Sequence, residues 1–220
     1  MKRGFTLAEI LIVLGVFFIL AVMIVPTTVH ESTDSRELIY KLQKSYDSLN
    51  QVAIILATEN NGELKNLCKN DDLNCLKDKF AEKLDYKKSC NTGIDSINTC
   101  WHDDIKSPVI SLDGTSDKTA FVPKTASILL SSGALLKFNS YDKTCPDGLC
   151  GKIYVDVNGF RPPNVAGKDV FGMYLNSAGI VPIGSLSTES TSCSKGNISS
   201  SIACTAKFVS TEDLSDIPSK

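Results

Sequence analysis

Apolar residues dominate the start of the chain and separate it from everything that follows. The run from Ile10 to Val25 contains no polar side chain, and extending it back to Phe5 gives 21 residues. As an α-helix this segment would be roughly 31 Å long, close to the roughly 30 Å of a bilayer's hydrocarbon core. Lys2 and Arg3 precede it, and basic residues favour the cytoplasmic side. The pattern predicts a membrane helix with a cytoplasmic N-terminus and an extracytoplasmic remainder.

Farther along, the apolar positions recur at three- and four-residue steps, the period of an amphipathic helix. The stripe comprises Leu38, Leu42, Tyr46, Leu49, Val52 and Leu56, and Asn60-Asn61-Gly62 is expected to end the helix. Residues 32–34 contain Ser and Asp and could re-cap the helix on the way. We predict one long helix that is apolar all round in its first half and packs against a head in its second. A shorter amphipathic helix is predicted over residues 73–84.

From Phe121 onward the period shortens to that of β-strands. We expect a hairpin of residues 126–130 and 134–138, and further strands at 152–156, 170–175 and 180–183. Residues 87–120 are expected to be irregular, with Trp101 plugging a core beneath its loop and His102 at the surface. The Ser/Thr-rich segment 185–201 reads as a solvated loop, or else as a display segment. A long helix lying on a small antiparallel sheet is an α+β architecture.

Composition changes this picture mainly through cysteine. All eight cysteines follow residue 67, and an even number confined to this part indicates disulfides formed in an oxidising compartment. They are Cys68, Cys75, Cys90, Cys100, Cys145, Cys150, Cys193 and Cys204. Pairing of sequential neighbours is the simplest arrangement, although the spacing alone does not fix it. Zinc binding is the alternative, but no Cys-x-x-Cys pair occurs and only His30 and His102 could assist.

The junction Gly4-Phe5 and the acidic Glu9 distinguish the N-terminal segment from a plain anchor. A carboxylate at a membrane-embedded position costs about 2.5–3.5 kcal/mol and normally has a partner. No Lys or Arg occurs between Arg3 and Arg36, so a cation must come from elsewhere, such as a new α-amine on another copy. A cleaved secretory signal is disfavoured, because the run ends at Val25-Pro26-Thr27 without a small-x-small site.

The sequence Lys2-Arg3-Gly4-Phe5-Thr6-Leu7-Ala8-Glu9, followed by the apolar run, resembles the N-terminal signal of type IV pilins and type II secretion pseudopilins. The resemblance implies that a prepilin peptidase cuts between Gly4 and Phe5 and methylates Phe5. It also implies that Glu9 pairs with a neighbour's N-terminal amine during assembly. The implied organisation is a cleaved leader (1–4), a transmembrane and assembly helix (5–28), and a disulfide-stabilised, extracytoplasmic pilin-like head (29–220). Relatives often carry Gly where this chain has Phe18.

On this resemblance we expect a structural subunit of a type IV pilus-like or type II secretion filament, and not an enzyme. The expected location is the inner (cytoplasmic) membrane, crossed once, and then the filament. The expected partners are prepilin peptidase, other pilin or pseudopilin subunits, the inner-membrane assembly machinery and membrane lipid. The alternative is a minor tip subunit acting as a binding module in adhesion, cargo recognition or DNA uptake. DNA is the weakest ligand, because the formal net charge is −2 and no basic stripe appears.

Residues 156–169 (DVNGFRPPNVAGKD) form the one segment of the head with candidate chemistry. Asp156, Asn158 and Asp169 offer oxygen atoms of the kind that Ca²⁺ prefers, and some pseudopilins hold calcium in a loop near their sheet. The spacing is not that of an EF-hand. A structural turn is the alternative, because Asn-Gly is a strong hairpin signal and Asp and Asn bond their own backbone in turns. The sequence leaves both interpretations open, with Ca²⁺ as the only candidate cofactor.

Overall fold

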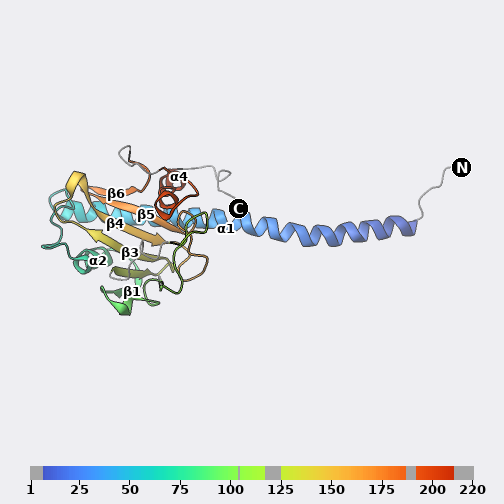
Figure 1. Ribbon diagram of the computed structural model, residues 1–220, viewed down its shortest axis with the longest axis horizontal. Coiled ribbons are helices and arrows are strands. Elements are labelled where there is room, and N and C mark those ends of the chain that lie inside the picture. Colours follow the sequence, from blue (N-terminus) through green and yellow to red (C-terminus); the bar gives the residue numbers. More distant parts are fainter. Residues whose placement is uncertain (1–6, 104, 117–124, 187–191, 211–220) are drawn as a thin grey trace.

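The longest element of the protein is helix α1 (Leu7–Glu59), which projects from one end of a head formed by the rest of the chain (Figure 1). The computed structural model describes residues 7–103, 105–116, 125–186 and 192–210, apart from the side chains of Glu9 and of residues 20–34. The helix continues without interruption past Pro26 and residues 32–34, so it is not re-capped there. Within these described ranges, no helix provides a stretch that is both long and apolar enough to cross a membrane.

The C-terminal half of α1 turns the expected apolar stripe towards the head. Its enclosed positions are Ile39, Leu42, Leu49, Val52, Ala53, Leu56 and Ala57. The helix ends where the sequence predicts: Asn61 and Gly62 adopt positive φ, and Gly62 N donates to the carbonyl oxygen of Ala57 at 2.7 Å. The predicted second helix is α2 (Leu73–Ala81), whose first turn is capped by Asp72 accepting from Asn74 N.

Six antiparallel strands form one sheet in which each strand pairs with its neighbours in sequence. The strands are β1 (Tyr86–Cys90), β2 (Ala126–Leu130), β3 (Leu135–Tyr141), β4 (Leu149–Asp156), β5 (Val170–Asn176) and β6 (Gly179–Pro182). Strands β2 to β6 confirm the strands expected from residue 126 onward. The protein is therefore an α+β protein with a six-stranded antiparallel sheet and disulfides.

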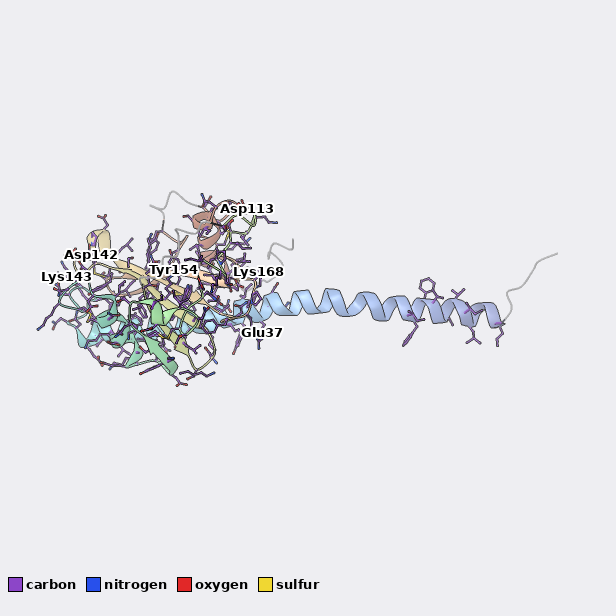
Figure 2. All side chains as sticks on the ribbon, turned by 60° about the horizontal axis from the view of Figure 1, so that its bottom comes forward. Glu37, Asp113, Asp142, Lys143, Tyr154 and Lys168 are labelled. Carbon is purple, nitrogen blue, oxygen red and sulfur yellow. A yellow bond between two sulfur atoms is a disulfide. The ribbon has the colours of Figure 1, made fainter. Side chains whose placement is uncertain are left out.

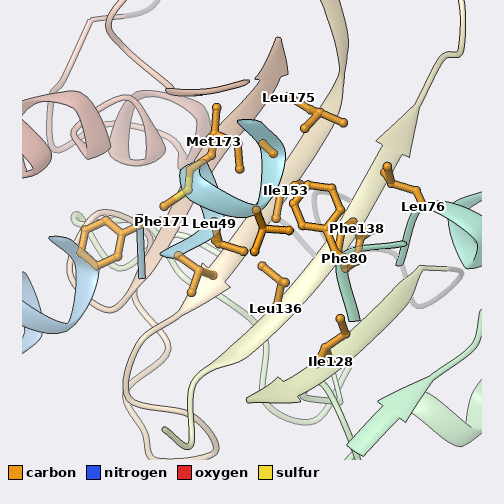
Figure 3. Close-up of a cluster of buried hydrophobic side chains, with 14 of the residues drawn as sticks. Leu49, Leu76, Phe80, Ile128, Leu136, Phe138, Ile153, Phe171, Met173 and Leu175 are labelled. Carbon is orange, nitrogen blue, oxygen red and sulfur yellow. The ribbon is translucent and has the colours of Figure 1, made fainter. Parts of the chain in front are cut away.

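The main core lies between one face of the sheet and helices α1 and α2 (Figure 3). Leu49 of α1 faces the sheet beside Leu136 and Met173, while Phe80 of α2 meets Phe138 edge to face with ring centroids 5.4 Å apart. Alternate residues of the strands point to the other face, where a second core gathers around Trp101. Its members are Trp101, Val109, Leu135, Ala166, Val170, Ile183, Ile198, Ile202 and Ala203. Both faces of the sheet are thus covered in this region.

Three elements were missed from the sequence. Strand β1 falls in the segment expected to be irregular, and its polar sequence, Tyr-Lys-Lys-Ser-Cys, becomes a strand through pairing with β2. Helices α3 (Ile198–Ile202) and α4 (Thr205–Ser210) follow Asn197, which caps α3 by accepting from Ser200 N at 3.0 Å. The expectation of a solvated loop is therefore wrong for residues 198–201, since Ser201 is buried and its hydroxyl accepts from Leu112 N. Serines whose hydroxyls bond locally do not need to face water.

The two edges of the sheet differ in what covers them. At one edge, α1 bonds the backbone of β6: Tyr46 Oη donates to Ile180 O at 3.3 Å, and Ile180 N donates to Asn50 Oδ1 at 3.0 Å. The other edge, β1, is short, carries the exposed Lys87 and Lys88, and has an irregular register beside Tyr86. Short strands, lysines and bulges are features that discourage pairing with another chain.

Four disulfides join the eight cysteines as sequential neighbours. The pairs are Cys68–Cys75, Cys90–Cys100, Cys145–Cys150 and Cys193–Cys204. No cysteine is left free, which removes the zinc alternative. Cys90–Cys100 fastens the end of β1 to the Trp101 loop, and Cys193–Cys204 fastens the segment before α3 to the residue that precedes α4.

Replacing Leu49 with Ala should lower the free energy of unfolding by about 2–5 kcal/mol, because Leu49 is fully buried at the centre of the main core. Urea titration of the full chain in detergent, followed by fluorescence of Trp101, measures this change. The exposed Gln51→Ala on the same helix is the matched control and should change stability by less than about 0.5 kcal/mol. Equal effects of the two variants would contradict the packing described for α1.

Candidate functional site: the buried His102–Asp156–Asp169 cluster

Two segments meet on the Trp101 side of the sheet and bring three titratable side chains together. One is the loop of residues 100–112, which follows the Cys90–Cys100 disulfide. The other is the β4–β5 connection, residues 157–169, which starts after Asp156 and ends at Asp169. His102, Asp156 and Asp169 are all buried. Buried ionisable groups outside a stable ion pair are uncommon, so the arrangement of their bonds decides what the site can do.

Asp156 accepts hydrogen bonds on both carboxylate oxygens. Its Oδ2 lies 2.7 Å from His102 Nε2, and its Oδ1 accepts from the backbone N–H groups of Asn158 (3.0 Å) and Gly159 (2.8 Å). The two backbone bonds form a turn of the kind that Asp commonly initiates. Gly159 has a φ of 73°, and a Cβ there would lie 2.4 Å from the carbonyl oxygen of Gly133. Asn158 and Gly159 therefore lie in a structural turn that Asp156 initiates.

Asp169 is bound within the same connection. Its Oδ1 accepts from the N–H of Val165, and its Oδ2 accepts from Asn158 Nδ2 at 2.9 Å. Asn158 thus donates to both carboxylates, through its backbone to Asp156 and through its side chain to Asp169. This shared donor holds two acidic groups close together in the protein interior.

The electrostatics of the pair follow from burial and from their proximity. Burial raises the pKa of Asp169 to about 7, and repulsion from Asp156 adds to this rise. Burial also raises the pKa of Asp156, although the hydrogen bond and charge of His102 act in the opposite direction. Two close carboxylates titrate as a unit, so near neutral pH the pair is expected to retain a proton.

His102 was expected at the surface, and this prediction is wrong. His102 is 4% exposed, bonded to Asp156, and enclosed by the rings of Trp101 (5.0 Å between centroids) and Phe160 (5.9 Å). The predicted role of Trp101 is confirmed: it is 3% exposed and belongs to the second core. The ring of Trp101 also lies 5.1 Å from the ammonium of the buried Lys137 on β3.

Sequence could not have found this cluster directly. His102 and Asp156 are 54 positions apart, and only the register of the sheet and the path of the loop bring them together. The available signal was a lone His beside a Trp and a disulfide-forming Cys, a combination that indicates a tethered loop more than a surface segment. The position of Lys137 also hinted at a buried polar contact, because a Lys within the alternating pattern of a strand faces either solvent or a buried partner.

The side chains around Asp156 do not fit a calcium site. Ca²⁺ prefers six to eight oxygen ligands, whereas all four carboxylate oxygens of Asp156 and Asp169 already accept bonds from protein donors. The amide oxygens of Asn158 and Asn164 are buried and accept no hydrogen bond from the described residues, but two such oxygens fall short of that number. Across the described ranges, no group of three or more His, Cys, Asp or Glu side chains is arranged to hold a metal ion.

The remaining predicted site residues lie at the far end of α1. Gly4 and Phe5 fall outside the described residues, and so does the side chain of Glu9, whose backbone belongs to the first turns of α1. The cleavage, methylation and assembly roles of these residues stay predictions. Comparison with known proteins adds no relative, because no family model, no curated protein and no solved structure matches the chain.

Adding Ca²⁺ should leave the melting temperature of the protein unchanged, because protein donors already occupy the carboxylates. Scanning calorimetry of the full chain in detergent, with calcium and with a chelator, measures this. Calcium at about one hundred times its dissociation constant would stabilise the folded state by about 2.7 kcal/mol if a site existed. A calcium-dependent rise that disappears in Asp169→Asn would show that the loop binds the ion.

Proposed function

We propose that the chain is a pilin-like structural subunit that is cut after Gly4, inserted in the membrane, and assembled into an extracytoplasmic filament through α1. The observation that carries this proposal is the order and spacing of four features at the N-terminus: a basic pair, the Gly4-Phe5 junction, Glu9 and the apolar run. The apolar run belongs to a helix that extends far from the head. A plain anchor accounts for the apolar run alone. It accounts neither for the Gly-Phe junction nor for an acidic residue within the run.

The exposed N-terminal part of α1, from Leu7 to Ile19, supports the proposal in physical terms. Ten large apolar residues near its N-terminal end are between 51% and 79% exposed: Leu7, Ile10, Leu11, Ile12, Val13, Leu14, Val16, Phe17, Phe18 and Ile19. In Figures 1 and 2 no other described element lies beside this part of the helix. These ten apolar residues surround the helix on all sides, so a single groove on a partner could not cover them. Lipid before assembly and the helices of other copies afterwards are environments that would enclose the whole circumference.

The location of the acid supports assembly between copies. Glu9 lies one turn from the new N-terminus that cutting at Gly4-Phe5 would create. An ion pair between Glu9 of one copy and the amine of Phe5 of another would remove two uncompensated charges from an apolar environment. Buried charges without partners are strongly unfavourable, so this pairing would fix the axial offset between neighbouring helices.

The head supports an extracytoplasmic location. Its four disulfides are typical of proteins that fold in oxidising compartments. A long helix whose second half packs on a small antiparallel sheet is also the architecture that the resemblance to pilins implies. The membrane step itself depends on the sequence of residues 5–28, part of which lies outside the described residues.

A minor, tip-located subunit is the second candidate. The observation that favours it is the exposure of Ile94, Ile105 and Phe160 on connections of the head that are remote in sequence from α1. Such residues could contact a surface or a secreted protein. The abundance of the protein in sheared filaments separates the two roles, since a major subunit would dominate the preparation and a tip subunit would be scarce.

Replacing Gly4 with Val should block maturation, because a peptidase that recognises the Gly-Phe junction needs the small residue before the cut. Mass spectrometry of the membrane-extracted protein, produced together with a prepilin peptidase, would detect the retained residues 1–4 and the absence of methylation on Phe5. Thr6→Ser, two positions away, is the control and should mature normally. Normal cutting of the Gly4 variant would refute the assignment of the cleavage site.

Replacing Glu9 with Gln should permit cutting but reduce filaments by more than about tenfold, since about 1.4 kcal/mol of lost pairing already changes an equilibrium tenfold. Immunoblotting of sheared filaments against the membrane fraction measures this. Glu37→Gln is the matched control on the same helix, because Glu37 is exposed and pairs with Lys41, at 2.6 Å, on the helix's own surface. An unchanged filament yield for the Glu9 variant would remove its assembly role and leave the cleavage prediction intact.

A further inference from the structure

The β4–β5 connection contains a stretch, residues 157–168, that combines exposed apolar and basic side chains and has no acidic ones. Its sequence is VNGFRPPNVAGK, in which Arg161 and Lys168 are the charged residues. Residues 160–163, Phe-Arg-Pro-Pro, are consecutive and all exposed. An exposed aromatic ring beside cations is typical of protein surfaces that touch the headgroups of a bilayer.

We propose that the exposed 160–163 turn, together with Lys168, rests on anionic phospholipid headgroups of the bilayer beside α1. The inference depends on the membrane insertion of α1 in the proposed function, and it goes beyond that function by giving the head a lipid contact of its own. Anionic lipid is the partner because both charged side chains of this stretch are cations.

The path of the sheet places this stretch at the end of the head from which α1 projects. At the opposite end, Leu64, just after α1, donates its N–H to the carbonyl oxygen of Ser177, which directly follows β5, at 2.6 Å. Strand β5 therefore ends beside the C-terminal end of α1, and the connection that precedes β5 lies at the other end. Figure 2 shows Lys168 and Glu37 at this end of the head, where α1 leaves it.

Arg161 lies close to the emerging helix. The pKa of Glu37 on α1 is lowered chiefly by its hydrogen bond and ion pair with Lys41, and the positive charge of Arg161 adds to this effect. Arg36 and Tyr40 are exposed on the same part of α1, with Tyr40 65% exposed. The helix thus offers the same combination of cation and aromatic ring at this level of the molecule.

Acidic side chains near the connection are engaged within the head. Glu37 forms its ion pair along α1, and Asp156 and Asp169, which flank the stretch, are buried and accept hydrogen bonds there. Asp103 and Asp113 on the neighbouring loop accept from nearby backbone N–H groups. Within the described part of the chain, the two cations of the stretch form no ion pair within 4.0 Å and are available to an anionic surface.

The length of α1 sets how the head can reach the bilayer. Glu37 lies about 18 Å beyond Val25, the last residue of the apolar run, at 1.5 Å per residue of an uninterrupted helix. The headgroup layer extends roughly 5–7 Å beyond the hydrocarbon core on each side. Membrane helices are commonly tilted by about 20°, which lowers one side of an attached head, and long Arg side chains extend its reach. Contact therefore requires α1 to lean towards the β4–β5 connection.

Acylation of lysines by a membrane-impermeant amine reagent tests the contact. Lys168 lies in the connection, whereas Lys65 is exposed just after the far end of α1. The full chain is inserted into phosphatidylcholine vesicles with or without phosphatidylglycerol, and the acylated peptides are quantified by mass spectrometry. We expect phosphatidylglycerol to lower the ratio of Lys168 to Lys65 acylation at least about threefold. At about 1 M salt, where the screening length is about 3 Å, the ratio should return to its value in neutral vesicles.

Arg161→Glu is the informative variant, because Arg161 is exposed and a reversed charge there would be repelled by an anionic surface. This variant should lose most of the lipid-dependent protection of Lys168. Lys69→Glu makes the same charge change at an exposed position near the opposite end of the head, and it should keep the protection. Flotation with the vesicles measures insertion of α1 in the same samples and should be equal for all three proteins.

The outcomes separate the lipid contact from membrane insertion. Equal acylation ratios in anionic and neutral vesicles, in a chain that floats, overturn the contact and leave the proposed function intact. A chain that floats with neither vesicle refutes membrane insertion, and the contact with it. Equal protection in neutral vesicles or detergent indicates another copy of the chain as the partner, and protection by soluble glycerol phosphate indicates a site for free anions. Each of these results overturns the lipid contact, and so does unchanged protection in a folded Arg161→Glu.

Discussion

The contact on which the rest of the structure depends is that between the apolar stripe of α1 and one face of the sheet. Leu42, Leu49 and Leu56 are enclosed there, and α2 extends the same layer through Phe80. An amphipathic helix is marginal alone, and a sheet with one apolar face needs a cover. Packing on the sheet therefore stabilises the C-terminal half of α1 as a helix, and the same contact stabilises the sheet. Residues 10–19 of the same helix are exposed, and this asymmetry within one helix supports the assembly role that we propose.

The opposite face of the sheet has to bury charged as well as apolar side chains. Since successive strand residues point to opposite sides, every residue that packs on α1 has a neighbour facing the other way. That second face carries Leu135 and Val170 but also Lys137 and Asp156, so an apolar cover alone would not suffice. The loop of residues 100–112 supplies a mixed cover, with Trp101 above Lys137 and His102 bonded to Asp156. The buried His102–Asp156 pair and Lys137 belong to the loop side of the head, whereas the helix side is lined mainly by the apolar residues of the main core, with Lys77 of α2 also buried there.

Periodicity predicted the elements that bury one face, and failed where long-range contacts decide the structure. The stripe from Leu38 to Leu56 and the strands from Ala126 onward follow directly from spacing, because their partners lie along a regular surface. Strand β1 has no apolar alternation and exists through pairing with β2, while α3 is a run of serines that a capping Asn and local hydroxyl bonds make helical. Of the candidate site, Asp156, Asn158 and Asp169 were predicted to act together. His102 could not be added, because its partner is distant in sequence and the polarity of its segment indicated exposure.

The covered edge at β6 has a consequence for how copies of this protein can meet. Tyr46 and Asn50 of α1 occupy the outward N–H and C=O of Ile180, and the opposite edge carries two lysines. A neighbour's strand would meet bonded backbone at β6 and two lysines at β1, so both margins of the sheet disfavour backbone-to-backbone polymerisation of the head. In the filament that we propose, growth would then depend on the helix and not on the sheet. On this proposal, the sequence of the head could vary without altering the helix contacts that build the filament.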